Sequence, residues 1–179
     1  INTKIKNYLK KLLLAEKVYG KKEKNITSSR KNKTIYIDKE ASSALCLVKD
    51  KLLYPLTKLM GQAESKKVLE SGLINGMTFP FPFILAPAGA KNETIIKSLE
   101  VGEEVTIICE GEVFAYLKVD ETFQIDRNER VKHIYGTDDF SHPGVMTTIK
   151  RLGSWAVCGE YEIVDKKLNE NVKMIQDAK

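Results

Sequence analysis

The 179-residue sequence lacks any long hydrophobic run. No stretch approaches the roughly 20 apolar residues that are needed to span a bilayer. The run Leu12-Leu13-Leu14-Ala15 is too short for the apolar part of a secretory signal and is flanked by lysines. Glycine and cysteine are also too scarce for a collagen-like chain or a disulfide scaffold. These absences exclude the membrane-spanning, collagen-like and disulfide-stabilised classes of protein.

Cysteine and histidine are both scarce. Cys46, Cys109 and Cys158 stand far apart, and no two form a CxxC pair. An odd number of cysteines without a secretory signal predicts reduced thiols and a cytoplasmic location. The apolar neighbours of the cysteines favour buried, inert side chains over reactive thiols. Because the only histidines are His133 and His142, we expect no structural zinc site.

The net charge of +5 is unevenly distributed along the chain. Residues 1–33 carry ten lysines and one arginine against two glutamates, a net charge of +9. The remaining 146 residues hold 18 basic and 22 acidic side chains. A basic protein suggests nucleic-acid binding, but that interpretation applies here only to the N-terminal arm. We therefore expect no nucleic-acid partner for the rest of the chain.

The composition, with 42% hydrophobic and 30% charged residues, is typical of one globular domain with a small appendage. Residues 3–19 have apolar side chains at spacings of three and four, which predicts an amphipathic helix, and a polar linker follows. We divide the chain into a basic helix and linker at 1–33, a domain at 34–165 and a polar tail at 166–179. The tail could also begin a linker to a further domain.

The domain contains both helical and strand patterns. Asp38 is placed to cap a helix over 39–49, and a second helix over 62–71 ends at Gly72. A third helix or helical turn is predicted over 127–135. We interpret Pro143-Gly144 as a turn.

Strand patterns dominate the second half of the domain. Val105, Ile107 and Cys109 alternate with outward positions, and a turn at 110–112 leads into a strand over 113–121, which predicts a β-hairpin. Further strand-like segments are expected at 35–37 and 155–164, while the two prolines within 79–83 predict an extended edge segment. Together the patterns predict an α+β fold with a small β-barrel and flanking helices.

The segment 135–145 holds the densest group of polar and turn-forming residues. Its sequence is Tyr135-Gly136-Thr137-Asp138-Asp139-Phe140-Ser141-His142-Pro143-Gly144-Val145. Chemistry alone favours a rigid loop whose side chains bond to their own backbone over a catalytic site. Asp138 and Asp139 are adjacent, which is weak evidence for an acid/base pair. The chain also lacks the glycine and lysine spacing of a phosphate-binding loop.

The same segment, read from Ile134, strongly resembles the "YGT-TD-x-x-HPGV" segment of bacterial ATP sulfurylases (sulfate adenylyltransferases). Three other segments resemble this family in the same order. They are Leu53-Tyr54-Pro55-Leu56-Thr57-Lys58-Leu59-Met60-Gly61 ("FSPL-x-GFM-G"), Gly76-Met77-Thr78-Phe79-Pro80-Phe81-Pro82 ("DG-x-x-WPIPI") and Leu99-Glu100-Val101-Gly102-Glu103-Glu104-Val105 ("LKVGDEV"). The similarity covers roughly residues 35–164.

The sequence departs from the family pattern at several positions. Lys58-Leu59 stands where the family has Gly-Phe, Leu52-Leu53 replaces the glycine before "FSPL", Phe79 replaces a tryptophan and Asn75 an aspartate. The family's Gln-x-Arg-Asn, His-rich and Gly-Arg-Asp-His motifs, which belong to its catalytic domain, are absent. The resemblance thus implies the N-terminal PUA-like domain of such an enzyme, without its catalytic half.

For function, the resemblance implies an accessory role in sulfate assimilation. The family joins ATP, as its magnesium complex, and sulfate to give adenylyl sulfate and pyrophosphate. We expect this chain alone to be inactive and to hold no cofactor. Its expected partner is the missing C-terminal catalytic domain, and the resemblance leaves a homo-oligomer open. The alternative is a PUA-like RNA-binding or protein-interaction module that acts without catalysis.

The segment 135–145 is the predicted contact with that missing domain. We expect it to form a rigid loop, because restricted proline and permissive glycine suit a fixed docking surface. No catalytic or metal-binding residue is assigned. The predicted interface residues are Tyr135, Gly136, Thr137, His142, Pro143 and Gly144.

Overall fold

The computed structural model describes residues 32–164. The predicted helix at 3–19, almost all of the linker and the polar tail lie outside the described residues. Within residues 32–164 no helix is long and apolar enough to cross a bilayer.

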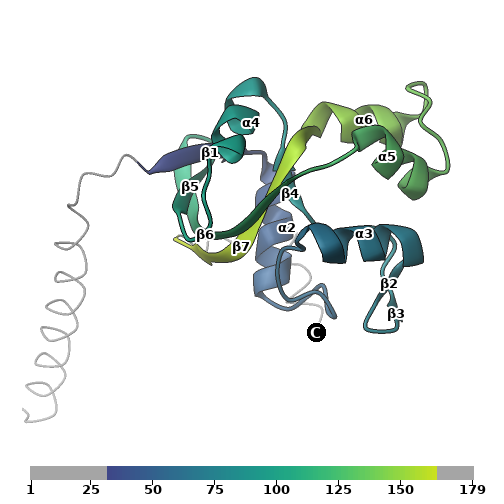
Figure 1. The fold of residues 1–179 in the computed structure, drawn as a ribbon, viewed down its shortest axis with the longest axis horizontal. Helices are drawn as coiled ribbons and strands as arrows, with labels where there is room; N and C mark the ends of the chain where they lie inside the picture. Colours follow the sequence, from purple (N-terminus) through teal and green to yellow (C-terminus); the bar gives the residue numbers. More distant parts are fainter. Residues whose placement is uncertain (1–31, 165–179) are drawn as a thin grey trace, which may run out of the picture. The chain divides into compact units, whose positions relative to one another are not determined.

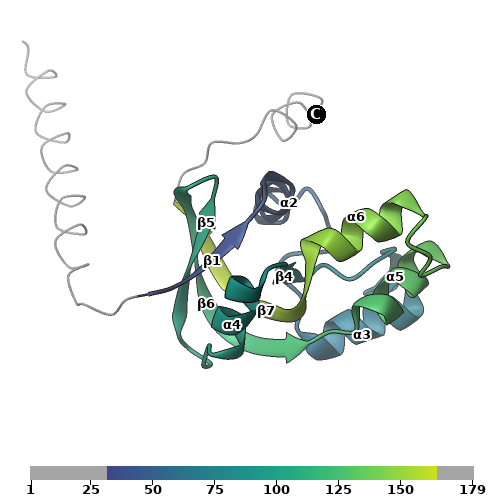
Figure 2. The same ribbon diagram turned by 90° about the horizontal axis from the view of Figure 1, so that it is seen from above.

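A five-stranded sheet forms the centre of the described part. Its order is β1 (Lys33–Ile37), β5 (Glu104–Cys109), β6 (Glu112–Gln124), β7 (Leu152–Ile163) and β4 (Leu85–Pro87). Only β1 and β5 are parallel, and the other neighbouring pairs are antiparallel. The sheet curls strongly (Figures 1 and 2), which brings the edge strands β1 and β4 into contact without pairing. The mixed fold with a curled, barrel-like sheet confirms the predicted α+β class.

The main core cluster includes residues from all five strands of this sheet. The alternation predicted for β5 is confirmed at Val105 and Ile107, which are both fully buried, whereas Cys109 is half-buried. Glu110 and Gly111 both have positive φ, at 52° and 88°, which is the geometry of the two-residue hairpin turns that match strand twist. The hairpin of β5 and β6 therefore forms as the sequence predicts, with β6 longer than expected at both ends.

Helix α2 (Lys39–Lys49) follows β1 directly. Asp38 caps it, because its side chain accepts a hydrogen bond from the Ala41 amide, and its predicted bounds are confirmed. The buried face of α2 carries Leu45 and Val48. Helix α4 (Ala90–Lys97) packs on β1 and β7 and was not predicted.

Three helices lie together beside the sheet (Figure 2). Helix α3 (Gln62–Ser71) ends at Gly72 as predicted, and the short hairpin of β2 (Leu73–Ile74) and β3 (Met77–Thr78) follows it. Helix α5 (Arg127–Tyr135) contacts both α3 and α6 (Pro143–Arg151).

The prediction of a turn at Pro143-Gly144 is wrong, because both residues belong to the first turn of α6. Proline suits this position, since the first helical amides have no partner within the helix. Residues 79–83, predicted as an extended edge segment, belong to no helix or strand and bend at Phe81.

Candidate functional site

The structure brings the six predicted interface residues together at the junction of α5 and α6. Tyr135 ends α5, and Gly136 follows it with the left-handed φ of 73°. His142 is the N-terminal cap of α6. The complete set is Tyr135, Gly136 and Thr137 on one side of the loop, and His142, Pro143 and Gly144 on the other.

The loop between the helices is held by its own side chains. The Thr137 hydroxyl accepts from the Asp139 amide at 3.1 Å, and the Asp139 carboxylate accepts from both the amide and the hydroxyl of Ser141 at 2.8 Å. These bonds from Ser141, the backbone bond first, lower the pKa of the Asp139 carboxyl. The predicted self-bonded loop is therefore confirmed.

The ring of Tyr135 closes the loop from one side. Its centroid lies 5.3 Å from that of His142, and its hydroxyl is 2.8 Å from the Thr148 hydroxyl on α6. A side chain at Gly144 would place Cβ 2.7 Å from Cε1 of Tyr135, so a larger residue there would displace the ring. The small residue after Pro143 thus lets α5 and α6 approach closely.

The junction has no evident catalytic arrangement. Nδ1 of His142 accepts from the Val145 amide, although at 3.4 Å this bond is long, and both oxygens of Asp139 accept from Ser141. Within residues 32–164 no group of three histidine, cysteine or carboxylate residues is placed to hold a metal ion. The junction does expose apolar surface, because Phe140 is 60% and Met146 40% exposed. Its geometry suits a contact surface.

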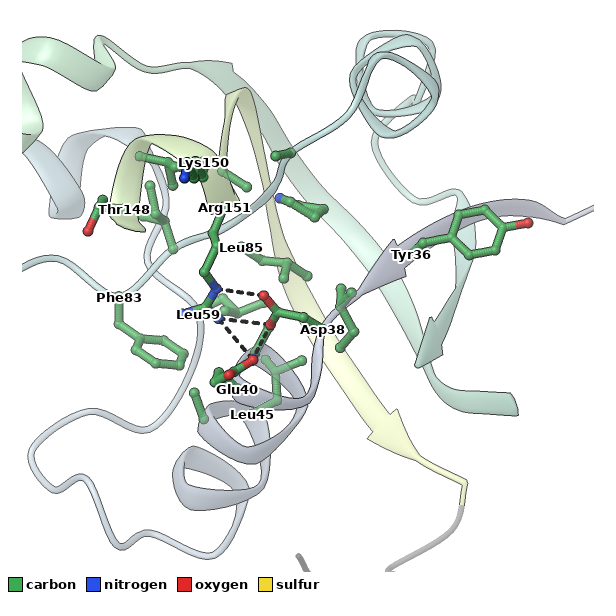
Figure 3. A pocket seen from close by; sticks show the side chains of 18 of the residues that line it. Tyr36, Asp38, Glu40, Leu45, Leu59, Phe83, Leu85, Thr148, Lys150 and Arg151 are labelled. Carbon is green, nitrogen blue, oxygen red and sulfur yellow. Dashed lines mark hydrogen bonds and ion pairs between the residues drawn. The ribbon is translucent and has the colours of Figure 1, made fainter. Parts of the chain in front are cut away.

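A cleft of about 490 Å³ lies beside the C-terminal half of α6, and the sequence did not predict it. Figure 3 shows it between the start of α2, the segment around Phe83 and the end of α6. Its apolar wall includes Leu45, Leu59, Phe83 and Leu85.

The mouth of the cleft is fixed by an ion-pair network (Figure 3). Arg151 donates from Nε and Nη2 to the two oxygens of Asp38, at 2.6 and 2.8 Å, and lies 3.6 Å from Glu40. The hydrogen bond from Arg151 lowers the pKa of Asp38 and raises that of Arg151. The network joins the end of β1 to the end of α6 and leaves Arg151 with two carboxylate partners.

Arg130, which also lines the cleft, has a different environment. Its Nη2 donates to the Pro82 carbonyl at 2.6 Å, but its buried Nε has no acceptor among the described residues. No ion pair within residues 32–164 includes it. Burial lowers the pKa of the Arg130 guanidinium to about 10. Nothing in the charged stretch Arg127-Asn128-Glu129-Arg130 distinguishes this arginine in the sequence.

The buried cysteines lie outside both sites. Cys46 and Cys158 are buried, and Cys109 is half-buried. Burial raises the pKa of the Cys158 thiol to about 11, so this thiol stays protonated at neutral pH. The burial predicted from the sequence is confirmed for Cys46 and Cys158.

Comparison with known families and proteins gives a consistent similarity. The model of a family described as "PUA-like domain" matches residues 5–166. The sulfate adenylyltransferase of Symbiobacterium thermophilum is 31% identical over 147 residues, which are 81% of this chain and 36% of that protein. The sulfate adenylyltransferase of Chlorobaculum tepidum is 32% identical over 100 residues, 54% of this chain and 24% of that protein.

The matched part of the chain thus spans about a quarter to a third of the length of the curated relatives. Among solved structures, the hexameric APS kinase from Thiobacillus denitrificans superposes with a TM-score of 0.48 at 19% identity. That superposition covers 74% of this chain and 21% of the other.

Proposed function

Because the chain belongs to the PUA-like domain family, we propose that it is the N-terminal accessory domain of a sulfate adenylyltransferase. The whole enzyme would join ATP and sulfate to give adenylyl sulfate and pyrophosphate. The extent of the similarity carries this proposal, since most of this chain matches one part of the relatives of that name.

The chemistry of the described residues supports an accessory role. Adenylyl transfer needs several positioned cationic groups or helix N-termini around the reacting phosphates. In the described part, several basic side chains are instead used in ion pairs, as Lys33 is with Glu103, Lys39 with Glu110 and Arg151 with Asp38. The domain would therefore supply packing surface, and adenylyl transfer would occur elsewhere in the enzyme.

The junction of α5 and α6 is the proposed contact with the catalytic domain. The bonds of Asp139 and the packing of Tyr135 fix the loop, so little conformational entropy is lost when it docks. Exposed Phe140 provides the apolar anchor expected near the centre of an interface. Tyr135 and Met146, 37% and 40% exposed, extend the apolar surface around it.

A segment exchange tests the proposal. Residues 5–166 replace the matching segment of the S. thermophilum enzyme, and synthesis of adenylyl sulfate and thermal unfolding are measured. We expect an active chimera in which Phe140→Ala destabilises the folded protein by about 1 kcal/mol or more, as removal of an interface anchor does.

Val101 provides the matched control, because it is 78% exposed and lies outside the loop. We expect Val101→Ala to leave the chimera unchanged, and both substitutions to change the isolated chain by less than about 0.5 kcal/mol. A folded but inactive chimera would count against the accessory role. Equal effects of the two substitutions in the chimera would count against the docking loop.

A further inference from the structure

The cleft beside α2 combines an apolar wall with an arginine that has no counter-ion among the described residues. Protein cavities that bind small molecules are mostly apolar, occupy roughly 300–1,000 Å³ and carry a few polar groups that orient the ligand. The volume of about 490 Å³ falls in this range, and Leu59 and Phe83 supply apolar surface. The cleft is therefore suited in size and lining to a small organic ligand.

The charges around the cleft indicate the sign of that ligand. Arg151 is neutralised by Asp38 and Glu40, so the carboxylates at the mouth are already paired. Arg130 and Lys150 line the same cleft, and within residues 32–164 neither forms an ion pair. The uncompensated charge of the cleft is thus positive.

Arg130 lacks both a counter-ion and an acceptor for its Nε among the described residues. Arg130 is half-buried as a residue and its Nε is fully enclosed, and a charge in such a position without a counter-ion is costly and is commonly explained by a function. An oxyanion in the cleft would neutralise the charge of the guanidinium and accept from Nη1, because Nε is enclosed by protein and Nη2 donates to Pro82. The hydrogen bond to the Pro82 carbonyl holds the side chain in place for such a contact.

We propose that this cleft binds a small organic anion, with its apolar part against Leu59 and Phe83 and its oxyanion group at Arg130. The proposal does not depend on the catalytic context proposed above, because only residues of this chain form the cleft. It adds a ligand site to a domain for which the sequence predicted none.

The test uses the full 179-residue chain and two matched probes. One is 1-anilinonaphthalene-8-sulfonate, an aromatic sulfonate, and the other is N-phenyl-1-naphthylamine, which has the same rings without the charge. Fluorescence titration gives affinity and stoichiometry, and amide chemical shifts locate the bound sulfonate. We expect one sulfonate per chain, shifts concentrated on residues that line the cleft such as Ala44 and Ala88, and binding of the neutral probe weaker by about tenfold or more.

Arg130→Met should weaken binding of the sulfonate by about tenfold or more, because it removes the charge but keeps an unbranched side chain. Lys132→Met is the matched control, since Lys132 is an exposed cation on the same helix and lines none of the clefts that include Arg130. We expect it to change the affinity by less than about twofold.

If Arg130→Met does not fold, Ala44→Phe provides a second test, because it fills the cleft from α2 and leaves Arg130 in place. It should also abolish binding of the sulfonate. Equal affinity for the charged and neutral probes, shifts outside the cleft, or unchanged binding in the variants that fold would each overturn the proposal.

Discussion

At the scale of the residue, Asp38 has two structural roles. Its carboxylate caps α2 through the Ala41 amide and also accepts two hydrogen bonds from Arg151, which is 113 positions away in sequence. The cap is local and could be predicted from the sequence, as it was. The ion pair could not, because it depends on how the sheet brings the end of β1 beside the end of α6.

Asp38→Asn separates these two roles. Asparagine can still cap the helix, but it has no charge to pair with Arg151. Because both side chains are 42% exposed, we expect a loss of about 0.5–1 kcal/mol in the free energy of unfolding at pH 7, measured by urea denaturation.

The stabilisation by the ion pair of Asp38 and Arg151 depends on pH. The folded pKa of Asp38 lies below its ordinary value of 3.8, so the stabilisation is present above that pH. This stabilisation is lost as the pH falls through the lowered pKa of Asp38 in the folded protein. The wild type and Asp38→Asn should then become equally stable. Asp138→Asn is the control for the loss of one carboxylate charge, because Asp138 is exposed and no ion pair within residues 32–164 includes it. A gap between the wild type and Asp38→Asn that does not narrow as the pH falls below 3.8 would contradict this assignment.

At the scale of the element, the β6–β7 pair depends on a bulge. The register shifts between Val119 and Glu121 on β6, opposite Gly159 on β7. Gly159 has a φ of 156°, and a Cβ there would overlap the Lys118 carbonyl oxygen on the neighbouring strand. Backbone atoms cannot move aside as a flexible side chain can, so this position requires glycine.

Gly159→Ala should therefore reduce the free energy of unfolding by about 2–4 kcal/mol, because the strands must separate to admit a methyl group. Gly102→Ala is the control: its φ is 86° but no atom lies within 4 Å of the added Cβ. It should cost only about 1–2 kcal/mol, from the backbone conformation alone. Chemical denaturation measures both values, and equal losses would show that the close approach to Lys118 is unimportant.

The elements also show what the sequence could and could not predict. The helix over 39–49 and the hairpin of β5 and β6 were predicted because local signals determine them, namely the Asp38 cap and the alternation of Val105 and Ile107. Helix α6 was missed because Pro143-Gly144 has the composition of a turn. Packing against Tyr135 explains the glycine in that helix, and no local pattern reveals this contact.

The two candidate sites also differ in whether the sequence could predict them. The loop residues from Tyr135 to Gly144 were found because they are contiguous in sequence. The cleft was not, because Asp38, Phe83 and Arg130 come from distant segments that only the fold brings together. Arg130 could be recognised only from its missing counter-ion, which is a property of the structure.

At the scale of the whole molecule, the boundary between the basic and acidic parts of the chain does not coincide with the boundary of the family match. The positive charge belongs to residues 1–33, whereas the remaining residues are net acidic. The family match nevertheless extends over 5–166 and includes most of the basic segment. The net acidic body is a poor surface for phosphate contacts, which makes RNA binding by the body the weaker functional interpretation.

Our central proposal is that this chain contributes a domain, and no chemistry of its own, to a sulfate adenylyltransferase. The most direct test is sulfate-dependent release of pyrophosphate by the purified 179-residue chain with ATP and magnesium, beside the complete S. thermophilum enzyme. We predict turnover by the complete enzyme and, for this chain, a rate equal to the protein-free background. Pyrophosphate release by this chain that rises with sulfate concentration would contradict the claim.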